Sequence, residues 1–361
     1  MKFLPKKHLI GENIQRPEWY NSSNRDQRMI FLDKNENNDE ILQKIHAKNL
    51  SSISKSSLSN YPDNSYLYNK LANHLEVSPK NLLLGPGSDG IIRSVFETFI
   101  NQGDKVIITS PTFAMYPIYS KIYQARIIEI EYLSKNGRPY MSVDTVLSAL
   151  NSSGAKLFCL PNPDSPTGTI FDEEEIKSII KTANENSTLV LIDEAYYPFY
   201  NNTAIKFIDS FENLIIARTF AKAWALAGLR TGYGISSKNL IQYMHKIKSM
   251  YEINTLASNM LCNTIDNYSD VMESVDRLNS GKNWFIDELR KLNFDVWESH
   301  GNFFHINFGD FSNQIHDKLS KIVLYRKEFK EDCLIGFSRF SSTTKKEFAI
   351  ILNEIKNVVL K

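Results

Sequence analysis

Between about residue 80 and residue 235, short apolar runs typical of strands alternate with longer segments that repeat apolar residues at helical spacing. The strand-like runs are residues 106–109, 126–130, 157–160, 188–192, 214–217 and 231–235. The helical segments between them include residues 89–100, 114–124, 143–150 and 173–184. Alternation of this kind is typical of βαβ units, whose strands run parallel. The sequence therefore predicts an α/β domain with a mostly parallel central sheet flanked by helices.

The C-terminal third of the chain has a different pattern. Helical repeats over about 237–293 are followed by short strand-like runs and by an amphipathic helix from about 344. The expected strands in this part are residues 295–298, 303–307, 322–325 and 334–340. A length of 361 residues exceeds what one hydrophobic core usually spans. We therefore expect a large domain over residues 34–255 and a smaller α+β domain formed by 1–33 and 256–361.

The charge balance excludes a global attraction to polyanions. Lys and Arg number 42 and Asp and Glu 41, which leaves a formal net charge of +1. Neither a nucleic-acid partner nor an acidic membrane surface is expected from that balance. No apolar stretch reaches the roughly 18 to 20 residues of a membrane helix, and the N-terminus lacks the apolar run of a signal peptide.

The cysteines are few and scattered. Cys159, Cys262 and Cys333 lie far apart and form no CxxC pair. This spacing favours neither a disulfide framework nor a metal site, and it fits a reduced compartment. We expect a cytoplasmic protein without a bound metal.

Four polar segments fall where predicted strands end, and ligands of open parallel sheets bind at the carboxyl ends of the strands. The first is GPGSD at residues 85–89, directly before a helical pattern. Glycines let the backbone approach a ligand closely, and free N–H groups at a helix start attract phosphate. By itself the segment also fits an ordinary turn with Ser88 or Asp89 as the N-cap.

The second segment is NPDSPTG at residues 162–168, after the predicted strand that ends at 160. Its two prolines and its glycine favour a rigid polar loop beside the sheet. An ordinary turn has a similar composition, but the string is too specific for that interpretation to be preferred.

The third segment is DEAY at residues 193–196, after an apolar run. A carboxylate at a buried strand end needs a partner. The N–H of a pyridinium ring would serve, because Asp193 would keep that nitrogen protonated and make the ring an electron sink. The alternative is an exposed acid at a strand end, and this motif alone does not decide between them.

The fourth segment is TFAKAW at residues 219–224, followed by GLRTG at 228–232. A lysine in mostly apolar surroundings has a lowered pKa, as imine chemistry requires. Thr219 and Arg230 are suited to hold a phosphate, the arginine through its planar fork. Taken singly, Lys222 would be read as a solvated surface charge.

In this order the segments resemble the class I and II aminotransferases, which are pyridoxal-phosphate (PLP) enzymes of fold type I. Among these the chain looks most like histidinol-phosphate aminotransferases. The resemblance covers most of the chain. Further segments that carry it are DKNEN at 33–37, NYP at 60–62, PTFAMY at 111–116, GNF at 301–303 and RFS at 339–341.

The resemblance implies roles around the cofactor. Lys222 would bind PLP covalently and move the proton between substrate and cofactor, Asp193 would pair with the ring nitrogen, and Tyr196 would bond the ring O3′. Phe113 would stack on the ring, and Tyr61 would reach the cofactor phosphate from the other subunit of an obligate homodimer. The implied cofactor-binding residues are Gly87, Ser88, Asp89, Phe113, Ser165, Asp193, Tyr196, Thr219, Lys222, Arg230 and Tyr61.

The resemblance also implies a substrate side. Arg339 would grip the substrate α-carboxylate, with Asn35 near it. Aligning through Cys333 and Leu334 would instead put Ile335 at the carboxylate position, but Arg339 brings the last helix into register without a gap. The arginine that grips the substrate phosphate in histidinol-phosphate enzymes would fall at Tyr325, with Arg326 next to it. If this segment is a strand, neighbours point to opposite faces.

Other positions also depart from the family pattern. Ser165 replaces an asparagine that bonds the ring O3′, Ala221 replaces a serine that contacts the phosphate, and Gly90 replaces an acid. These departures leave the cofactor chemistry intact but put the identity of the substrate in question.

Three functions are therefore considered. The first is a PLP aminotransferase that uses glutamate as donor and a small phosphorylated amine, ketone or aldehyde as its other substrate. The second is a PLP decarboxylase of a phosphorylated amino acid, such as serine or threonine phosphate. The third is a non-catalytic PLP-binding module of a transcription regulator, which is disfavoured because the motifs begin near residue 33. His300 and His305 lack metal-ligand spacing and are expected to be ordinary hydrogen-bonded histidines.

Overall fold

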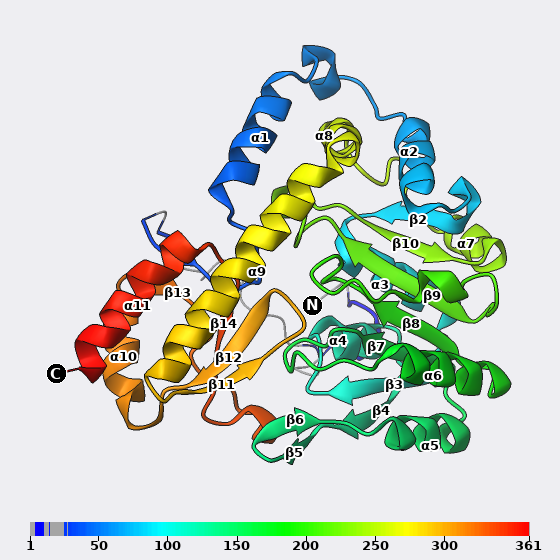
Figure 1. Ribbon diagram of the computed structural model, residues 1–361. Helices are drawn as coiled ribbons and strands as arrows, with labels where there is room; N and C mark the ends of the chain where they lie inside the picture. The colour runs from blue at the N-terminus through cyan, green and yellow to red at the C-terminus, as the bar shows by residue number, and fades with distance from the viewer. Residues whose placement is uncertain (1–3, 11–13, 15–24, 27, 361) are drawn as a thin grey trace.

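The computed structural model describes residues 4–10, 14, 25, 26 and 28–360 (Figure 1). Residues 1–3, 11–13, 15–24, 27 and 361, most of which belong to the expected 1–33 part of the small domain, lie outside the described residues. Among the described helices, none is both long and apolar enough to cross a membrane.

A seven-stranded sheet forms the centre of the large lobe, in the order β2-β10-β9-β8-β7-β3-β4. The strands are β2 (Leu82–Gly85), β3 (Lys105–Ser110), β4 (Arg126–Glu131), β7 (Leu157–Pro161), β8 (Leu189–Asp193), β9 (Leu214–Thr219) and β10 (Gly232–Ser236). All neighbours pair in parallel except β10, which runs antiparallel to both β2 and β9. The predicted mostly parallel sheet flanked by helices is confirmed. The edge strand β2 is an element that the sequence analysis did not predict.

Helices cover both faces of this sheet. Successive residues of each strand are therefore buried on opposite sides. In β9, Leu214 and Ile216 join one core, while Ile215 and Ala217 join the other. The first core is completed by α2 (Ser65–Leu75), α5 (Val143–Ser153), α6 (Glu173–Glu185) and α8 (Thr255–Asp266). The second is completed by α3 (Gly87–Phe99), α4 (Met115–Ile122) and α7 (Lys238–Met244).

The small lobe is built on a three-stranded antiparallel sheet, in the order β11-β12-β14. Its strands are β11 (Asp295–Glu298), β12 (Phe303–Asn307) and β14 (Ser338–Ser341). Helices α9 (Tyr268–Lys291), α10 (Ser312–Leu319) and α11 (Lys345–Val359) bury one face of this sheet in a core of their own. Phe304, Ile306 and Phe340 point into that core, so the intervening residues of β12 and β14 point to the other face.

Short elements join the two lobes. Strand β1 (Ile30–Phe31) pairs in parallel with β13 (Val323–Leu324), and Leu32 enters the small-lobe core. Helix α1 is Glu40–Ser51, and a hairpin of β5 (Leu133–Lys135) and β6 (Arg138–Tyr140) follows β4. The strand predicted at 322–325 is only β13 (Val323–Leu324), and the one predicted at 334–340 starts later than expected because a 3₁₀ turn at Asp332–Leu334 precedes β14.

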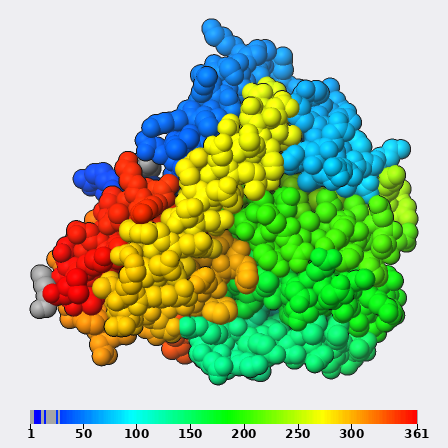
Figure 2. Space-filling view, in the orientation of Figure 1, coloured from blue at the N-terminus to red at the C-terminus, as the bar shows by residue number. Residues whose placement is uncertain are grey.

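Helix α9 crosses from one core to the other, which bears on where the domains divide. Val271 and Val275 are buried with the large sheet, whereas Phe285 and Leu289 are buried with the small one. Figure 2 shows α8 and α9, in yellow, as a ridge across the surface between the blue N-terminal helices and the orange C-terminal part. The whole of α8 belongs to the first core of the large sheet. We propose two domains with their division inside α9 rather than at residue 255.

The middle of α9 also touches the chain just after β14. A Cβ atom on Gly281 would lie 2.1 Å from the carbonyl oxygen of Thr343. Real Cβ contacts are never this short, so only glycine allows this approach. The helix is thereby fixed against the strand that carries Arg339.

Candidate active site

A cavity of about 430 Å³ lies where the carboxyl ends of β7, β8 and β9 face the small sheet. Most of the residues singled out from the sequence line it. These are Asn35, Ser88, Asp89, Phe113, Ser165, Asp193, Tyr196, Thr219, Lys222, Arg230, Arg326 and Arg339. Gly87, Tyr61 and Tyr325 do not line it. The structure thus brings together residues that are more than 300 positions apart.

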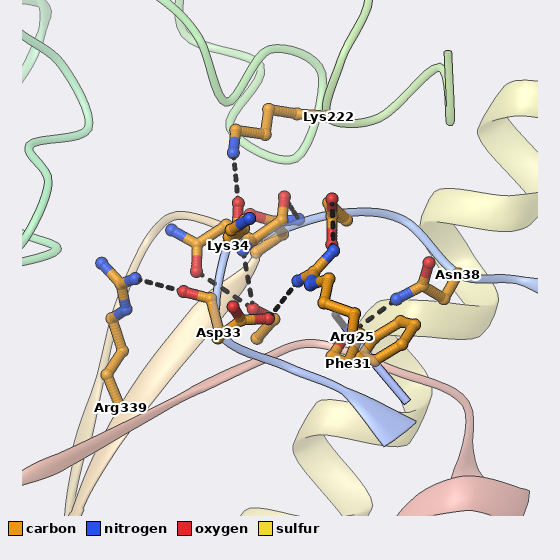
Figure 3. A network of polar contacts seen from close by, with 11 residues as sticks. Arg25, Phe31, Asp33, Lys34, Asn38, Lys222 and Arg339 are labelled. Carbon is orange, nitrogen blue, oxygen red and sulfur yellow. Dashed lines mark hydrogen bonds and ion pairs between the residues drawn. The ribbon is translucent and has the colours of Figure 1, made fainter. Parts of the chain in front are cut away.

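Lys222 follows β9 and is partly buried at the cavity. Its Nζ donates a hydrogen bond to the carbonyl oxygen of Lys34 at 2.6 Å (Figure 3). Burial, aided by the nearby guanidinium of Arg339, lowers the pKa of Lys222 to about 8. An appreciable fraction of this amine is therefore neutral and nucleophilic near neutral pH.

Asp193 ends β8 with its carboxylate buried. Oδ2 accepts a hydrogen bond from the Tyr116 hydroxyl at 3.0 Å, and Oδ1 accepts one from the Ala195 N–H at 3.0 Å. Burial outweighs these bonds and raises the pKa of Asp193 to about 6. A cationic partner in the cavity would relieve this cost. Sequence reasoning missed Tyr116, although it lies one helical turn after Phe113 in the PTFAMY segment.

The start of α3 and the chain before β10 form a narrow cradle. Gly87 has φ +80°, and a Cβ atom on it would lie 3.2 Å from Nη2 of Arg230. A Cβ on Gly232 would lie 2.4 Å from the carbonyl carbon of Gly87. Both glycines therefore allow the helix start to lie directly against the arginine. Free N–H groups at a helix start, together with a guanidinium, suit a phosphate.

Tyr196 and Asn35 connect the large sheet to the small one. The Asn35 Nδ2 donates to the Tyr196 hydroxyl at 2.8 Å, and the Ser341 hydroxyl on β14 donates to Asn35 Oδ1 at 3.1 Å. Asn35 has φ 55°, and its carbonyl accepts from Asn302 Nδ2 at 2.9 Å. The side chain is therefore fixed on both sides, with little freedom to move on its own.

Asp33 and Lys34 line the cavity, and Figure 3 shows them between Lys222 on one side and Arg25 on the other. Arg25 forms ion pairs with Asp33 and with Glu36, the latter at 2.8 Å. From the other side, Nη2 of Arg339 donates to the carbonyl oxygen of Asp33 at 2.9 Å. Main-chain and side-chain groups together hold this segment against both lobes.

A second buried acid, Asp164, lies behind the cavity lining in the NPDSPTG loop. Its Oδ2 accepts from the Thr167 N–H at 3.0 Å and from the Thr167 hydroxyl at 2.6 Å. Among the described residues, Oδ1 has no hydrogen-bond partner. Burial raises the pKa of Asp164 to about 7. Sequence reasoning did not single this residue out, because burial cannot be read from a loop of polar residues.

Two arginines line the cavity from the small lobe. Arg326 and Arg339 form an antiparallel bridge through their main chains, with N–H to carbonyl distances of 3.2 and 2.8 Å. Residues opposite each other in such a pair point to the same face. Both guanidinium groups accordingly reach the same cavity.

Tyr325, expected to contact substrate, points away from the cavity into the small-lobe core. Its ring stacks on Phe340 with centroids 4.3 Å apart, and its hydroxyl lies 2.5 Å from Nδ1 of His316. Strand alternation explains why Arg326, and not Tyr325, faces the cavity. Of the two neighbouring positions, the structure leaves Arg326 as the candidate for the phosphate.

Tyr61 lies on the surface outside the cavity. Its side chain is 78% exposed, and its ring stacks on Tyr251 with centroids 4.3 Å apart. Within one chain it cannot contribute to the site. In the described part of the chain, no group of three or more His, Cys, Asp or Glu side chains is arranged to hold a metal ion.

Comparison with known proteins gives a family. The family model for aminotransferases of class I and II matches residues 27–355. The histidinol-phosphate aminotransferase of Thermoanaerobacter pseudethanolicus is 35% identical over 333 residues, which cover 91% of this chain and 93% of the relative. That of Buchnera aphidicola is 32% identical, over 81% of this chain and 83% of the relative.

Solved structures show the same fold. The Clostridium acetobutylicum histidinol-phosphate aminotransferase has a TM-score of 0.81 at 23% identity, over 92% of this chain and 99% of the other. The Sinorhizobium meliloti enzyme, solved with pyridoxal 5′-phosphate, has a TM-score of 0.79 at 21% identity, over 92% of this chain and 91% of the other. The cavity carries a buried amine, a strand-end acid and a phosphate cradle, which fit that cofactor. This chain belongs to the class I and II aminotransferases and is a PLP-dependent aminotransferase of fold type I.

Proposed function

We propose that this aminotransferase transfers an amino group between glutamate and a small phosphorylated partner of the histidinol-phosphate type. The observation that carries the proposal is the pair of arginines, Arg326 and Arg339, on one face of the small lobe. Both line the cavity that holds Lys222. Two guanidinium groups suit a substrate pair with a carboxylate on one member and a phosphate on the other. The name of the Thermoanaerobacter relative points to the same substrate.

The residues of the cavity would have separate roles in binding the cofactor and in moving the proton. Bound PLP supplies an electron sink, and Asp193 would keep its ring nitrogen protonated. Ser88, Asp89, Thr219 and Arg230 would surround its phosphate, with Gly87 allowing the close approach. Phe113 would cover one ring face, and Tyr196, with Ser165 nearby, would bond the ring hydroxyl. Lys222 would hold the cofactor and then move a proton at the substrate Cα, a role worth typically about 10² to 10⁴-fold.

On the substrate side, Arg339 would bind the α-carboxylate of glutamate and Arg326 the phosphate of the partner. Asn35 would lie beside the carboxylate, anchored by Tyr196 and Ser341. Arginine is suited to both anions because its planar fork makes two parallel hydrogen bonds.

The test is a substrate screen on the purified holoenzyme. Amino transfer from glutamate to the keto partner of histidinol phosphate, with 2-oxoglutarate as the other product, is the expected result. Release of carbon dioxide from phosphoserine or phosphothreonine without amino transfer would instead assign the alternative decarboxylase. Cofactor binding without either reaction would leave a non-catalytic module and overturn the proposal.

We also propose that the active form is a homodimer in which Tyr61 reaches the cofactor phosphate of the other subunit. Support comes from the exposure of large apolar side chains around Tyr61. Leu58 is 77% exposed, Tyr66 63% and Met250 83%. Burying such a surface against a second copy would remove apolar area from water, the usual driving force of a permanent interface.

Hybrid dimers test this arrangement. Tyr61→Phe and Lys222→Ala lie on different chains of a mixed dimer, so one of its two sites would retain both Lys222 and the opposite Tyr61. Mixing the two weakly active variants after dissociation should therefore restore up to half of the wild-type activity per dimer. No recovery on mixing, with dimers present in sedimentation, would contradict the crossing of Tyr61.

We place the enzyme in the cytoplasm, where its three buried, free cysteines stay reduced.

A further inference from the structure

His305 lies beside Arg339 on the cavity-facing side of the small sheet. The two residues are opposite each other in the pairing of β12 with β14. Side chains opposite each other share a face, with Cβ atoms roughly 4.5–5.5 Å apart. His305 is completely buried, and so is Phe303, over whose ring the Arg339 guanidinium lies at 5.3 Å. The imidazole thus lies within reach of the side chain that faces the cavity.

Three polar atoms at this place have no hydrogen-bond partner among the described residues. They are both ring nitrogens of His305 and the Nε of Arg339. Buried polar groups are nearly always paired, because an unpaired one loses its hydrogen bonds to water and gains none in return. The main chain of Pro166, in the NPDSPTG loop, is close enough to the ring to raise its pKa, but it forms no hydrogen bond with either ring nitrogen. The Nε–H donor of Arg339 and the carbonyl acceptor of Pro166 therefore lie near an imidazole that can act as both donor and acceptor.

The surroundings keep this imidazole neutral. The rings of Phe303, Phe329 and Phe337 contact it at centroid distances of 5.6, 5.5 and 6.4 Å. Burial, with the guanidinium groups of Arg339, Arg326 and Arg138, holds its pKa well below the usual range. A neutral imidazole has one N–H donor and one bare nitrogen acceptor. These match the carbonyl of Pro166 and the Nε–H of Arg339. In this structure the expectation of an ordinary hydrogen-bonded histidine is not met, because neither ring nitrogen has a partner among the described residues.

We propose that His305 is a positioning residue for Arg339. In the substrate complex, its bare ring nitrogen would accept a hydrogen bond from the Arg339 Nε–H and its ring N–H would donate to the carbonyl of Pro166, which gives partners to atoms that lack them among the described residues. The two bonds tie the arginine to the NPDSPTG loop of the large lobe. This fixes the plane of the guanidinium, so that its Nη atoms face the carboxylate of the substrate.

The same histidine reaches the second arginine through one phenyl ring. The Arg326 guanidinium lies 3.9 Å over the ring of Phe329, which in turn contacts His305. His305 and Phe329 thus lie beside the two arginines that line the cavity. A change of the imidazole is therefore expected to act first on Arg339 and less on Arg326.

The inference rests on the proposed carboxylate role of Arg339, so the experiment separates the two. Calorimetry on the holoenzyme measures the Kd of maleate, a dicarboxylate that cannot react because it has no amino group. His305→Phe keeps an aromatic ring without polar atoms, while His305→Gln and His305→Asn each return a donor and an acceptor. Phe337→Leu is the packing control, since it disturbs the same surroundings without changing a ring nitrogen.

For His305→Phe we expect a maleate Kd raised about tenfold or more, the usual loss for a hydrogen bond to a charged group. The KM for glutamate should rise in parallel, with kcat and the visible absorbance of the bound cofactor nearly unchanged. At least one of the Gln and Asn variants should return to within about threefold of wild type, and Phe337→Leu should stay near wild type.

Two results would overturn the inference. One is a His305→Phe variant that binds maleate like the wild type. The other is an equal loss in the Phe, Gln, Asn and Phe337→Leu variants, which would assign His305 to packing alone. If Arg339→Gln itself leaves maleate binding intact, the failure lies in the proposed role of Arg339 and not in that of His305.

Discussion

The two walls of the cavity carry opposite kinds of charge and are under opposite electrostatic stress. The sheet wall, at the carboxyl ends of β7, β8 and β9, contains the buried acids Asp193 and, behind the lining, Asp164. Burial raises the pKa values of these two carboxyl groups to about 6 and about 7. The arginine wall, formed by Arg326 and Arg339 of the small lobe with His305 buried beside Arg339, shows the reverse. There burial lowers the pKa values of Arg339 and His305.

Each wall therefore favours a partner of the charge that it lacks. A protonated ring nitrogen relieves the sheet wall, and an anionic substrate relieves the arginine wall. Lys222 stands between them, with a pKa lowered by burial first and by Arg339 second. The difference favours the proposal that one cavity holds cofactor and substrate through two separate charge complements. Substitutions should accordingly divide into those that affect cofactor chemistry and those that affect substrate binding.

The largest effect is expected at the residue between the walls. In the proposed mechanism, Lys222→Ala would remove both the attachment of the cofactor and the proton carrier. Turnover should fall by at least about 10⁴-fold, and the visible absorbance of the lysine-bound cofactor should disappear in a spectrum of the purified variant. Persistence of that absorbance would show that another residue carries the cofactor.

A smaller loss is expected on the sheet wall. If Asp193 pairs with the ring nitrogen as proposed, Asp193→Ala should leave that nitrogen without its buried partner, a change that typically costs about 2–5 kcal/mol and should lower kcat by roughly two to three orders of magnitude. Tyr116→Phe keeps the acid and removes only its hydroxyl donor, so its loss should be about tenfold. Steady-state kinetics at saturating glutamate measures both. Equal losses in the two variants would mean that Asp193 acts through Tyr116 and not on the cofactor.

On the arginine wall the effects should appear in KM and should depend on the substrate. Arg339→Lys loses the planar fork and should raise the KM for glutamate roughly 10- to 100-fold. Arg326→Lys should raise the KM for the phosphorylated partner by a similar factor and leave that for glutamate nearly unchanged. Each variant is the control for the other. A rise in KM for both substrates in both variants would show that the two arginines form a single anion site.

The smallest effect on turnover is expected behind the sheet wall, at Asp164. The pKa of its carboxyl group is about 7 in the folded chain, against ~3.9 in an unfolded one. Between these values the folded protein keeps a proton that the unfolded chain has lost. The free energy of unfolding therefore falls as the pH rises through this window.

Asp164→Asn has no such proton to lose and keeps an oxygen for Thr167. In the absence of added PLP, urea unfolding should find this variant more stable than wild type by a few kcal/mol at pH 8, and much less so near pH 4.5. Its turnover should stay within about twofold. The exposed Asp209, changed to Asn, is the matched control. A stability gain that does not depend on pH would show that Asp164 is not protonated in the folded protein.

The sheet wall was largely predictable from the sequence, because each of its motifs directly follows an apolar run. Asp193 and Lys222 come within a few residues of β8 and β9, so the position of the strand end places the side chain. The contact of Tyr116 with Asp193 spans 77 residues and depends on how α4 lies on the sheet. Such a contact is set by packing, which no local pattern records.

The arginine wall was harder to predict for two physical reasons. The segment at 323–326 is too short to show an alternation, so the sequence alone could not decide whether Tyr325 or Arg326 faces the cavity. The burial of His305 with unpaired nitrogens follows from its neighbours on β14 and from the rings of Phe329 and Phe337, which are distant in sequence. Strand β2 went unnoticed because its four residues are few for a periodic signal, and the antiparallel direction of β10 leaves no compositional trace.

Helix α9 has a mechanical consequence. With 24 residues it is roughly 36 Å long, and it is clamped at three points: the large-sheet core, the small-lobe core and the contact at Gly281. A rigid rod held in this way acts as a lever. A tilt of only about five degrees at one end displaces the other by ~3 Å at this length. Surface substitutions near Tyr268, far from any substrate, therefore have leverage on the spacing between the cofactor ring and the guanidinium of Arg339.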